Sequence, residues 1–319
     1  MKPPQIFKPV QTPMPPSQQE RAAPANSSDW PASTVIRRKA SHRIYTTVWY
    51  LVNGLLAAAI LLAIWSVGWE YSTRRYLKGF SDAIVPVSAG PEERIKAILN
   101  WMAHGPARQT AGPDGLTPDR DPTETLNYHA LLQVCGTATN AFINLADSGG
   151  LEARRLLLLD SRRLVKHVTA EVLVEGRWIV VDPAFRVILR GGDGKLLTRE
   201  QLADPATFAM ATRNIPGYDQ RYSFESTAHI RLGRLRIVGL PLRAVLDRIL
   251  PGWEETTLAS LVAERESLAF TLAVICLVAF LVFLRISLRW YGEKRLGLHT
   301  PRVREQIRRA FDAFVNSTS

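Results

Sequence analysis

Two long runs without formal charge constrain this chain more than any other feature. Residues 44–69 form a run of 26, and residues 267–284 a run of 18, with no Asp, Glu, Lys or Arg. About 20 apolar helical residues cross the hydrocarbon core of a bilayer, where the backbone must satisfy its own hydrogen bonds. We therefore expect two transmembrane helices. Aromatic residues suited to the membrane interface lie near the run ends: Tyr45, Trp49, Tyr50, Trp65, Trp69, Trp290 and Tyr291.

Two other interpretations of these runs are weaker. A cleaved signal peptide would lie at the N-terminus and end at an A-x-A site, whereas the first run begins only at Ile44 and no such site follows it. A buried core helix is the alternative for the second run, but apolar core segments are more often about 10–14 residues long.

Most of the formal net charge of +11 lies before the first run and after the second, and little of it lies between them. Residues 1–43 carry a net +5, residues 70–266 carry +1, and residues 285–319 carry +5. By the positive-inside rule, both termini are predicted to be cytoplasmic and the segment between the two spans extracytoplasmic. The basic flanks suit anionic lipid headgroups. Since no nucleic-acid-binding motif accompanies them, we expect contact with the lipid bilayer and no nucleic-acid partner.

The pattern predicts five segments along the chain. Residues 1–43 should form a basic cytoplasmic tail, disordered over 1–35 because Pro, Gln, Ser and Ala dominate there. The first span over 44–69, an extracytoplasmic domain over 70–266, the second span over 267–284 and a basic cytoplasmic tail over 285–319 follow.

Within the central domain, helical and strand patterns are mixed, which predicts an α+β fold with a core at about 90–215. A helix is expected to begin at Pro91, with Glu92 and Glu93 in its first turn. Its apolar stripe is Ile95, Ile98, Leu99 and Met102. We further predict a connection over 70–90 and a loop over 104–123. A helix is expected from Cys135 to the glycines at 149–150, followed by strands over 155–160, 167–174 and 177–181. Loop and a short helix should occupy 191–213, and an amphipathic surface stretch should occupy 232–266.

Cys135 begins its predicted helix, and it is the only cysteine outside the spans, because Cys276 lies within the second. A helix N-terminus and a nearby imidazolium both favour the nucleophilic thiolate. Helix N–H groups at that position could also form part of an oxyanion hole. Gln133, two residues upstream, is a weaker candidate donor.

The two later strands bring a histidine and an aspartate together. A two-residue turn at Glu175-Gly176 places Thr169 opposite Asp182, so that His167 and Asp182 share one face as a diagonal pair, about 7–8 Å apart at the backbone. The alternate residues from Val168 to Val174 then point to the opposite, buried face. A four-residue loop would preserve this register, whereas a three-residue loop would put the two side chains on opposite faces. Asp182 can then orient the imidazole of His167 towards Cys135.

Each of these residues also has an ordinary structural explanation. A lone cysteine is commonly a small buried hydrophobe, a strand histidine is commonly a satisfied polar residue, and Asp-Pro is a common turn. The order helix start, strand start and strand end favours a nucleophilic cysteine site over three unrelated residues. An unpaired thiol outside the cytoplasm points the same way, with an intermolecular disulfide as the competing explanation.

The segments VCGTATNAFINLADSGGLEARRLLL and KHVTAEVLVEGRWIVVDPAF resemble the transglutaminase-like superfamily, whose sites are papain-like Cys-His-Asp triads. The matching positions are Cys135, Gly136, Gly150, Ala153, Arg154, His167, Gly176, Trp178, Asp182 and Pro183. The resemblance covers roughly residues 90–190. It implies a helix bearing the cysteine packed on an antiparallel sheet, with Cys135, His167 and Asp182 as the catalytic triad.

The chain departs from the family pattern at three positions. Gln133 stands where members often have glycine, Thr169 where an aromatic residue is frequent, and Ala184 where threonine is frequent. These differences put the shape of the acyl pocket, and hence the substrate, in doubt.

An acidic loop precedes Cys135. Some related bacterial cysteine proteases bind calcium near the nucleophile, and hard oxygen ligands suit that ion. The spacing fits no known calcium loop, so we expect no cofactor and favour a solvated loop, with calcium left open. The acidic residues are Asp114, Asp119, Asp121 and Glu124. His104 and His129 form no zinc-like cluster.

With this resemblance, the expected function is a thiol enzyme anchored by two spans in a bacterial inner membrane, with its central domain in the periplasm. It would act on peptide or glutamine-type amide bonds of a protein or peptide in the cell envelope. It would work through an acyl-thioester and favour hydrolysis (protease or amidase) over cross-linking. The alternative is a catalytically silent transglutaminase-like scaffold or binding module. A transporter or channel is disfavoured because two spans without internal ionisable groups offer no pathway.

Overall fold

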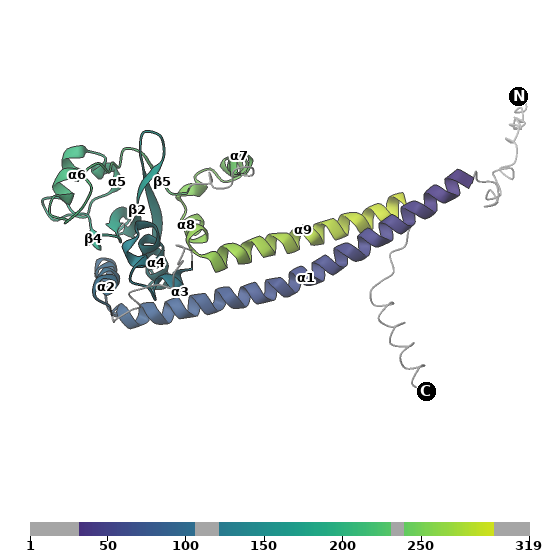
Figure 1. The fold of residues 1–319 in the computed structure, drawn as a ribbon, viewed down its shortest axis with the longest axis horizontal. Helices are drawn as coiled ribbons and strands as arrows, with labels where there is room; N and C mark the ends of the chain where they lie inside the picture. Colours follow the sequence, from purple (N-terminus) through teal and green to yellow (C-terminus); the bar gives the residue numbers. More distant parts are fainter. Residues whose placement is uncertain (1–31, 106–120, 231–238, 297–319) are drawn as a thin grey trace, which may run out of the picture. The chain divides into compact units, whose positions relative to one another are not determined.

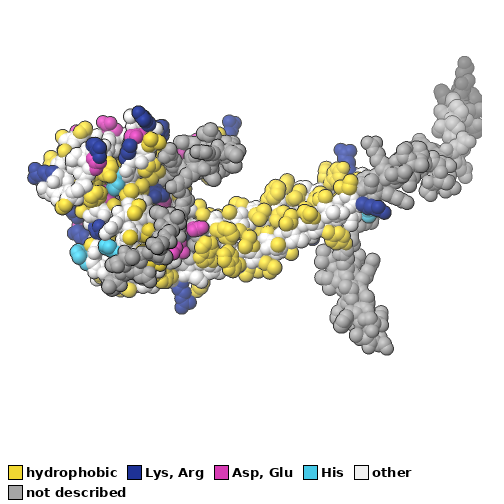
Figure 2. Space-filling model, viewed as in Figure 1, with side chains coloured by type: hydrophobic (Ala, Val, Ile, Leu, Met, Phe, Trp, Pro, Cys, Tyr) yellow, Lys and Arg dark blue, Asp and Glu magenta, His cyan; other side chains and the backbone are white. Residues whose placement is uncertain are grey.

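The computed structural model describes residues 32–105, 121–230 and 239–296. Its two longest helices are α1 (Ala32–Ile84) and α9 (Glu266–Arg295) (Figure 1). Both are long and apolar enough to cross a membrane, and hydrophobic side chains line them (Figure 2). The expected tail over 1–35 lies almost wholly outside the described residues.

The first helix is longer than the sequence pattern predicted. Residues 70–84, expected to be a connection, continue α1 without a break. Leu77 is fully buried on the inner face of this extension, and the Ser81 hydroxyl donates a hydrogen bond to the Leu145 carbonyl at 3.3 Å. The charged side chains of Arg74 and Lys78 are exposed, so the extension is amphipathic and packs on the domain.

The chain divides into two compact units, residues 55–283 and residues 1–54 with 284–319. In the smaller unit, the Tyr45 hydroxyl donates a hydrogen bond to the Leu288 carbonyl at 3.3 Å. Gly292 leaves room for the Tyr45 ring, which any Cβ at that position would meet.

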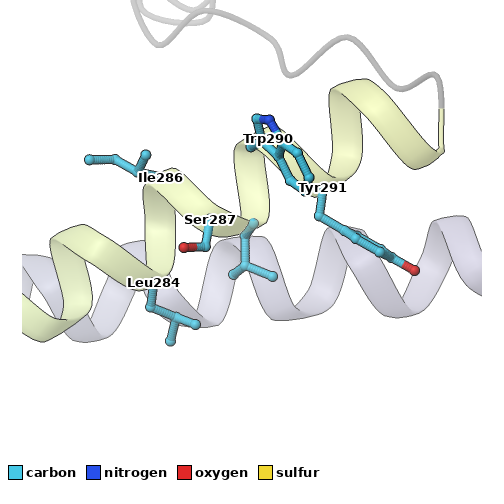
Figure 3. A pocket seen from close by; sticks show the side chains of 6 residues that line it. Leu284, Ile286, Ser287, Trp290 and Tyr291 are labelled. Carbon is cyan, nitrogen blue, oxygen red and sulfur yellow. The ribbon is translucent and has the colours of Figure 1, made fainter.

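A hollow of about 570 Å³ lies along α9 in the smaller unit, lined by Leu284, Ile286, Ser287, Leu288, Trp290 and Tyr291 (Figure 3). All six residues come from one helix, and Ile286 and Trp290 are largely exposed. Such an apolar helix surface suits lipid acyl chains, and we place no substrate there.

The larger unit contains a five-stranded antiparallel sheet in the order β4-β3-β2-β1-β5. Its strands are β1 (Ala153–Leu159), β2 (Val165–Val174), β3 (Arg177–Asp182), β4 (Val187–Ile188) and β5 (Thr227–Ala228). Together with the helices they make an α+β fold, as predicted. β4 and β5 are short edge strands that the sequence pattern did not indicate.

The hairpin of β2 and β3 has the predicted register. Ala170 pairs with Val181 and Val174 with Arg177, so the turn residues are Glu175 and Gly176. Both have positive φ values, 50° and 77°, which is the requirement of a type I′ turn.

Helices cover both faces of the sheet. On one face α4 (Cys135–Ser148) packs on β1 and β2 and is backed by α2 (Pro91–His104), whose predicted apolar stripe is buried. On the other face lie α5 (Arg199–Leu202) and α6 (Pro205–Thr212). The sequence pattern assigned burial only to the Val168 side of β2, but His167 on the other side is just 3% exposed. The second layer was missed because α5 and α6 are too short to give a clear periodicity.

The prediction that residues 232–266 form a surface stretch is partly wrong. This segment contains α7 (Gly239–Ile249), a 3₁₀ turn η5 (Trp253–Glu255) and α8 (Thr257–Glu264). α8 packs on α4 and β1, and Ser260 and Glu264 are buried there. The remaining short elements are α3 (Pro122–Thr125) and the 3₁₀ turn η3 (Leu131–Gln133), which lead into α4.

Candidate active site

Cys135 is the first residue of α4, with the extended Val134 before it as N-cap. The helix is tied to β2 close to this point, because the Thr139 hydroxyl donates a hydrogen bond to the Val168 carbonyl at 3.1 Å. The Cys135 side chain is partly exposed and packs beside Leu157 and Val168. Cys135 is thus held at the sheet and is partly exposed.

His167 lies on β2 next to an irregularity in the pairing with β1. Leu158 pairs with His167 but Leu159 pairs with Val165, so Lys166 is an extra residue. Bulges of this kind often re-aim a side chain beside a functional site. The Nε2 atom of His167 lies 2.7 Å from Oδ2 of Asp182, which leaves Nδ1 for the thiol of Cys135.

Asp182 ends β3 and is completely buried. Its Oδ1 accepts hydrogen bonds from the backbone N–H groups of Ala184 (3.1 Å) and Phe185 (3.3 Å). Its Oδ2 accepts one from the Tyr218 hydroxyl at 2.9 Å in addition to the His167 contact. Four donors therefore compensate the desolvation of this carboxylate and fix its orientation.

Cys135 and His167 shift each other's acidity. A hydrogen bond with His167, opposed by burial, lowers the pKa of the Cys135 thiol, and the backbone N–H groups of Val168 and Gly136 add to the effect. Burial by itself would lower the pKa of His167, but the hydrogen bonds with Asp182 and Cys135 outweigh it and raise that pKa to about 9. Both shifts favour a thiolate beside an imidazolium over a neutral thiol beside a neutral imidazole.

Three aromatic residues surround His167 that the sequence pattern did not predict to lie in the site. The Tyr222 ring lies parallel to the imidazole, whereas Tyr218 and Phe185 meet it edge-on, with centroids at 6.1 and 5.8 Å. Tyr218 and Tyr222 come from an irregular segment after α6, far from the hairpin in sequence. In the sequence, the two tyrosines are distinguished only by lying four residues apart after a glycine. That pattern is too common to indicate a functional site.

The weaker sequence candidates do not join the group. Gln133 is exposed at the end of η3, and the Asp121 carboxylate caps α3 through the Thr123 N–H at 2.9 Å. Asp114 and Asp119 lie outside the described residues. Within residues 32–105, 121–230 and 239–296, no three side chains of the metal-binding types gather into a site, and calcium binding stays untested.

No protein-family model matches the chain, and no curated protein matches it.

Proposed function

We propose that this chain is a membrane-anchored thiol enzyme with a papain-like, transglutaminase-like core, which cleaves or transfers amide groups through an acyl-thioester. One observation carries the proposal. Cys135, His167 and Asp182, from α4, β2 and β3, form a continuous hydrogen-bonded series with a partly exposed cysteine at one end and a buried carboxylate at the other. The resemblance of the segments around these residues to the transglutaminase-like superfamily points to the same triad.

The geometry suits a two-step acyl transfer. The Cys135 thiolate attacks the carbonyl carbon of an amide and forms a C–S bond, while N–H groups at the start of α4 offer hydrogen bonds to the oxyanion. The His167 imidazolium then gives its proton to the leaving amine as the C–N bond breaks. Neutral His167 next takes a proton from water, or from an acceptor amine, which attacks the thioester and restores the thiolate. Asp182 stays ionised and orients the imidazole.

An acyl-thioester can be intercepted with hydroxylamine. The full chain in detergent is incubated with a blocked Gln-Gly dipeptide and a mixture of short peptides, and peptide hydroxamates are sought by mass spectrometry. We expect hydroxamates that vanish in Cys135→Ala and fall by about 10²-fold or more in His167→Ala, because general acid–base help is worth about that much. Hydroxamates at equal levels in Cys135→Ala, or none at all across a peptide library, would favour the scaffold alternative.

The charge distribution supports a two-pass topology with the domain outside the cytoplasm. The resemblance implies that this compartment is the periplasm of a bacterial envelope. A reporter that is active only in the cytoplasm should be active when fused after Ser319 and inactive when inserted at Gly192. A reporter active only outside should give the opposite pattern. Activity of the cytoplasmic reporter at Gly192 would refute the orientation and, with it, the argument from an unpaired extracytoplasmic thiol.

A further inference from the structure

Tyr222 lies flat against the imidazole of His167. Their ring centroids are 4.5 Å apart and their planes differ by 4°. Tyr222 belongs to the irregular segment after α6, is partly exposed, and has no hydrogen bond from its hydroxyl among the described residues. The ring face, rather than the hydroxyl, therefore makes the contact with His167.

We propose that Tyr222 is a positioning residue that stabilises the imidazolium form of His167 by stacking and thereby extends the alkaline limit of the thiolate–imidazolium pair. The inference rests on the proposed function, because it assigns a role within that site. The face of an aromatic ring carries negative charge in its quadrupole and attracts a cation above it. A neutral imidazole gains much less, so the stack favours the protonated form.

The other charged and titratable groups around His167 do not occupy the ring face that Tyr222 covers. Asp182 faces it from β3 and Cys135 from α4, while Tyr218 and Tyr222 face it from the segment after α6. The two acidic groups contact opposite nitrogens at the ring edge, so neither occupies the ring face. Tyr222 covers that face and removes water from it.

The stack also fixes the rotation of the imidazole. The bond to Asp182 holds Nε2 but allows the ring to turn about that contact. A parallel neighbour at 4.5 Å restricts this turn, which keeps Nδ1 directed at Cys135. Positioning of this kind matters because misplacement of a reacting group by about 1 Å costs on the order of 10²-fold in rate.

The test is the pKa of His167, measured by NMR on the full chain in nanodiscs with ¹³C-labelled histidine. The His167 signal is assigned by its loss in His167→Ala. Tyr222→Phe keeps the ring and should leave the pKa within about 0.3 unit of the parent. Tyr222→Leu removes the ring and should lower the pKa by about one unit, the shift that a cation–π contact of ordinary strength produces. The alkaline limb of hydroxamate formation should move by the same amount.

The outcomes separate this inference from the proposed function. An equal pKa in Tyr222→Leu and the parent, with unfolding temperature unchanged, would overturn the role of the stack even if the enzyme were active. If Tyr222→Leu lowers the pKa of His167 but the parent chain shows no acyl transfer, the role of the stack is kept and the proposed function is refuted. An equal loss in Tyr222→Phe and Tyr222→Leu would overturn the inference by assigning the effect to the hydroxyl.

Discussion

Alkylation of Cys135 by iodoacetamide should be at least tenfold faster at pH 6 in the parent chain than in His167→Ala. An ordinary thiol with a pKa near 8.5 is less than about 1% ionised at that pH. In the parent, the neighbouring imidazolium lowers the pKa of Cys135, so more of the thiol is already thiolate.

The signs of the two shifts define the pH profile. Because the thiol pKa is lowered, reactivity persists to lower pH than in a free cysteine. Because the pKa of His167 is raised to about 9, the imidazolium persists up to that pH. The parent should therefore react across the neutral range, whereas His167→Ala should gain reactivity only as pH rises towards 8.5.

Cys276 is the one other cysteine of the sequence, so the measurement is made in a Cys276→Ser background with labelling read by mass spectrometry. Asp182→Asn serves as a matched variant. It keeps the side-chain size but removes the charge that supports the imidazolium, and it should fall between the parent and His167→Ala. A profile in the parent that coincides with that of His167→Ala would exclude an activated thiol.

The parts of this site that follow local rules could be predicted from sequence. The turn at Glu175-Gly176 fixes the hairpin register because only a residue pair that accepts positive φ closes a two-residue turn of this type. That register alone brings His167 and Asp182 to one face. The position of Cys135 followed equally from a helical pattern that begins there and ends at a glycine pair.

The parts that depend on tertiary packing could not be predicted. The extension of α1 to Ile84 looks like a polar connection because all its charged residues except Glu70 face solvent, and its single buried stripe has a partner only once α4 is in place. Tyr218 and Tyr222 reach His167 from a segment without periodicity. The burial of Arg265 against α1 and α4 had no signal in the sequence either, since an arginine beside a span usually indicates a membrane boundary.

Arg265 is expected to be the most sensitive position for the stability of the larger unit. Its side chain is 1% exposed, and its guanidinium contacts Glu70 of α1 at 3.3 Å and both Asn144 (2.8 Å) and Asp147 (2.9 Å) of α4. Ser267 donates a further hydrogen bond to Glu70 at 2.6 Å. One buried cation thus connects α1 to the far end of the helix that carries Cys135.

Arg265→Met should lower the free energy of unfolding by about 3 kcal/mol, because the fully buried cation is lost and the Glu70 carboxylate keeps only the exposed Arg74 and the Ser267 hydroxyl as partners. For a unit of this size the midpoint of thermal unfolding should fall by ~10 °C. Lys78→Met is the matched control. It breaks an exposed ion pair with Asp82 on the same helix and should change stability by less than about 1 kcal/mol.

The double variant Arg265→Met with Glu70→Met tests the cause. Replacing both partners of a buried ion pair by apolar side chains is often close to neutral, so the double variant should recover most of the stability lost in Arg265→Met. If it is as unstable as the sum of the two single variants, the residues act independently and the ion pair does not join α1 to α4. If the double variant regains the stability of the parent, its iodoacetamide profile at Cys135 should also match that of the parent. The N-terminus of α4 keeps its position only when the whole helix is stable.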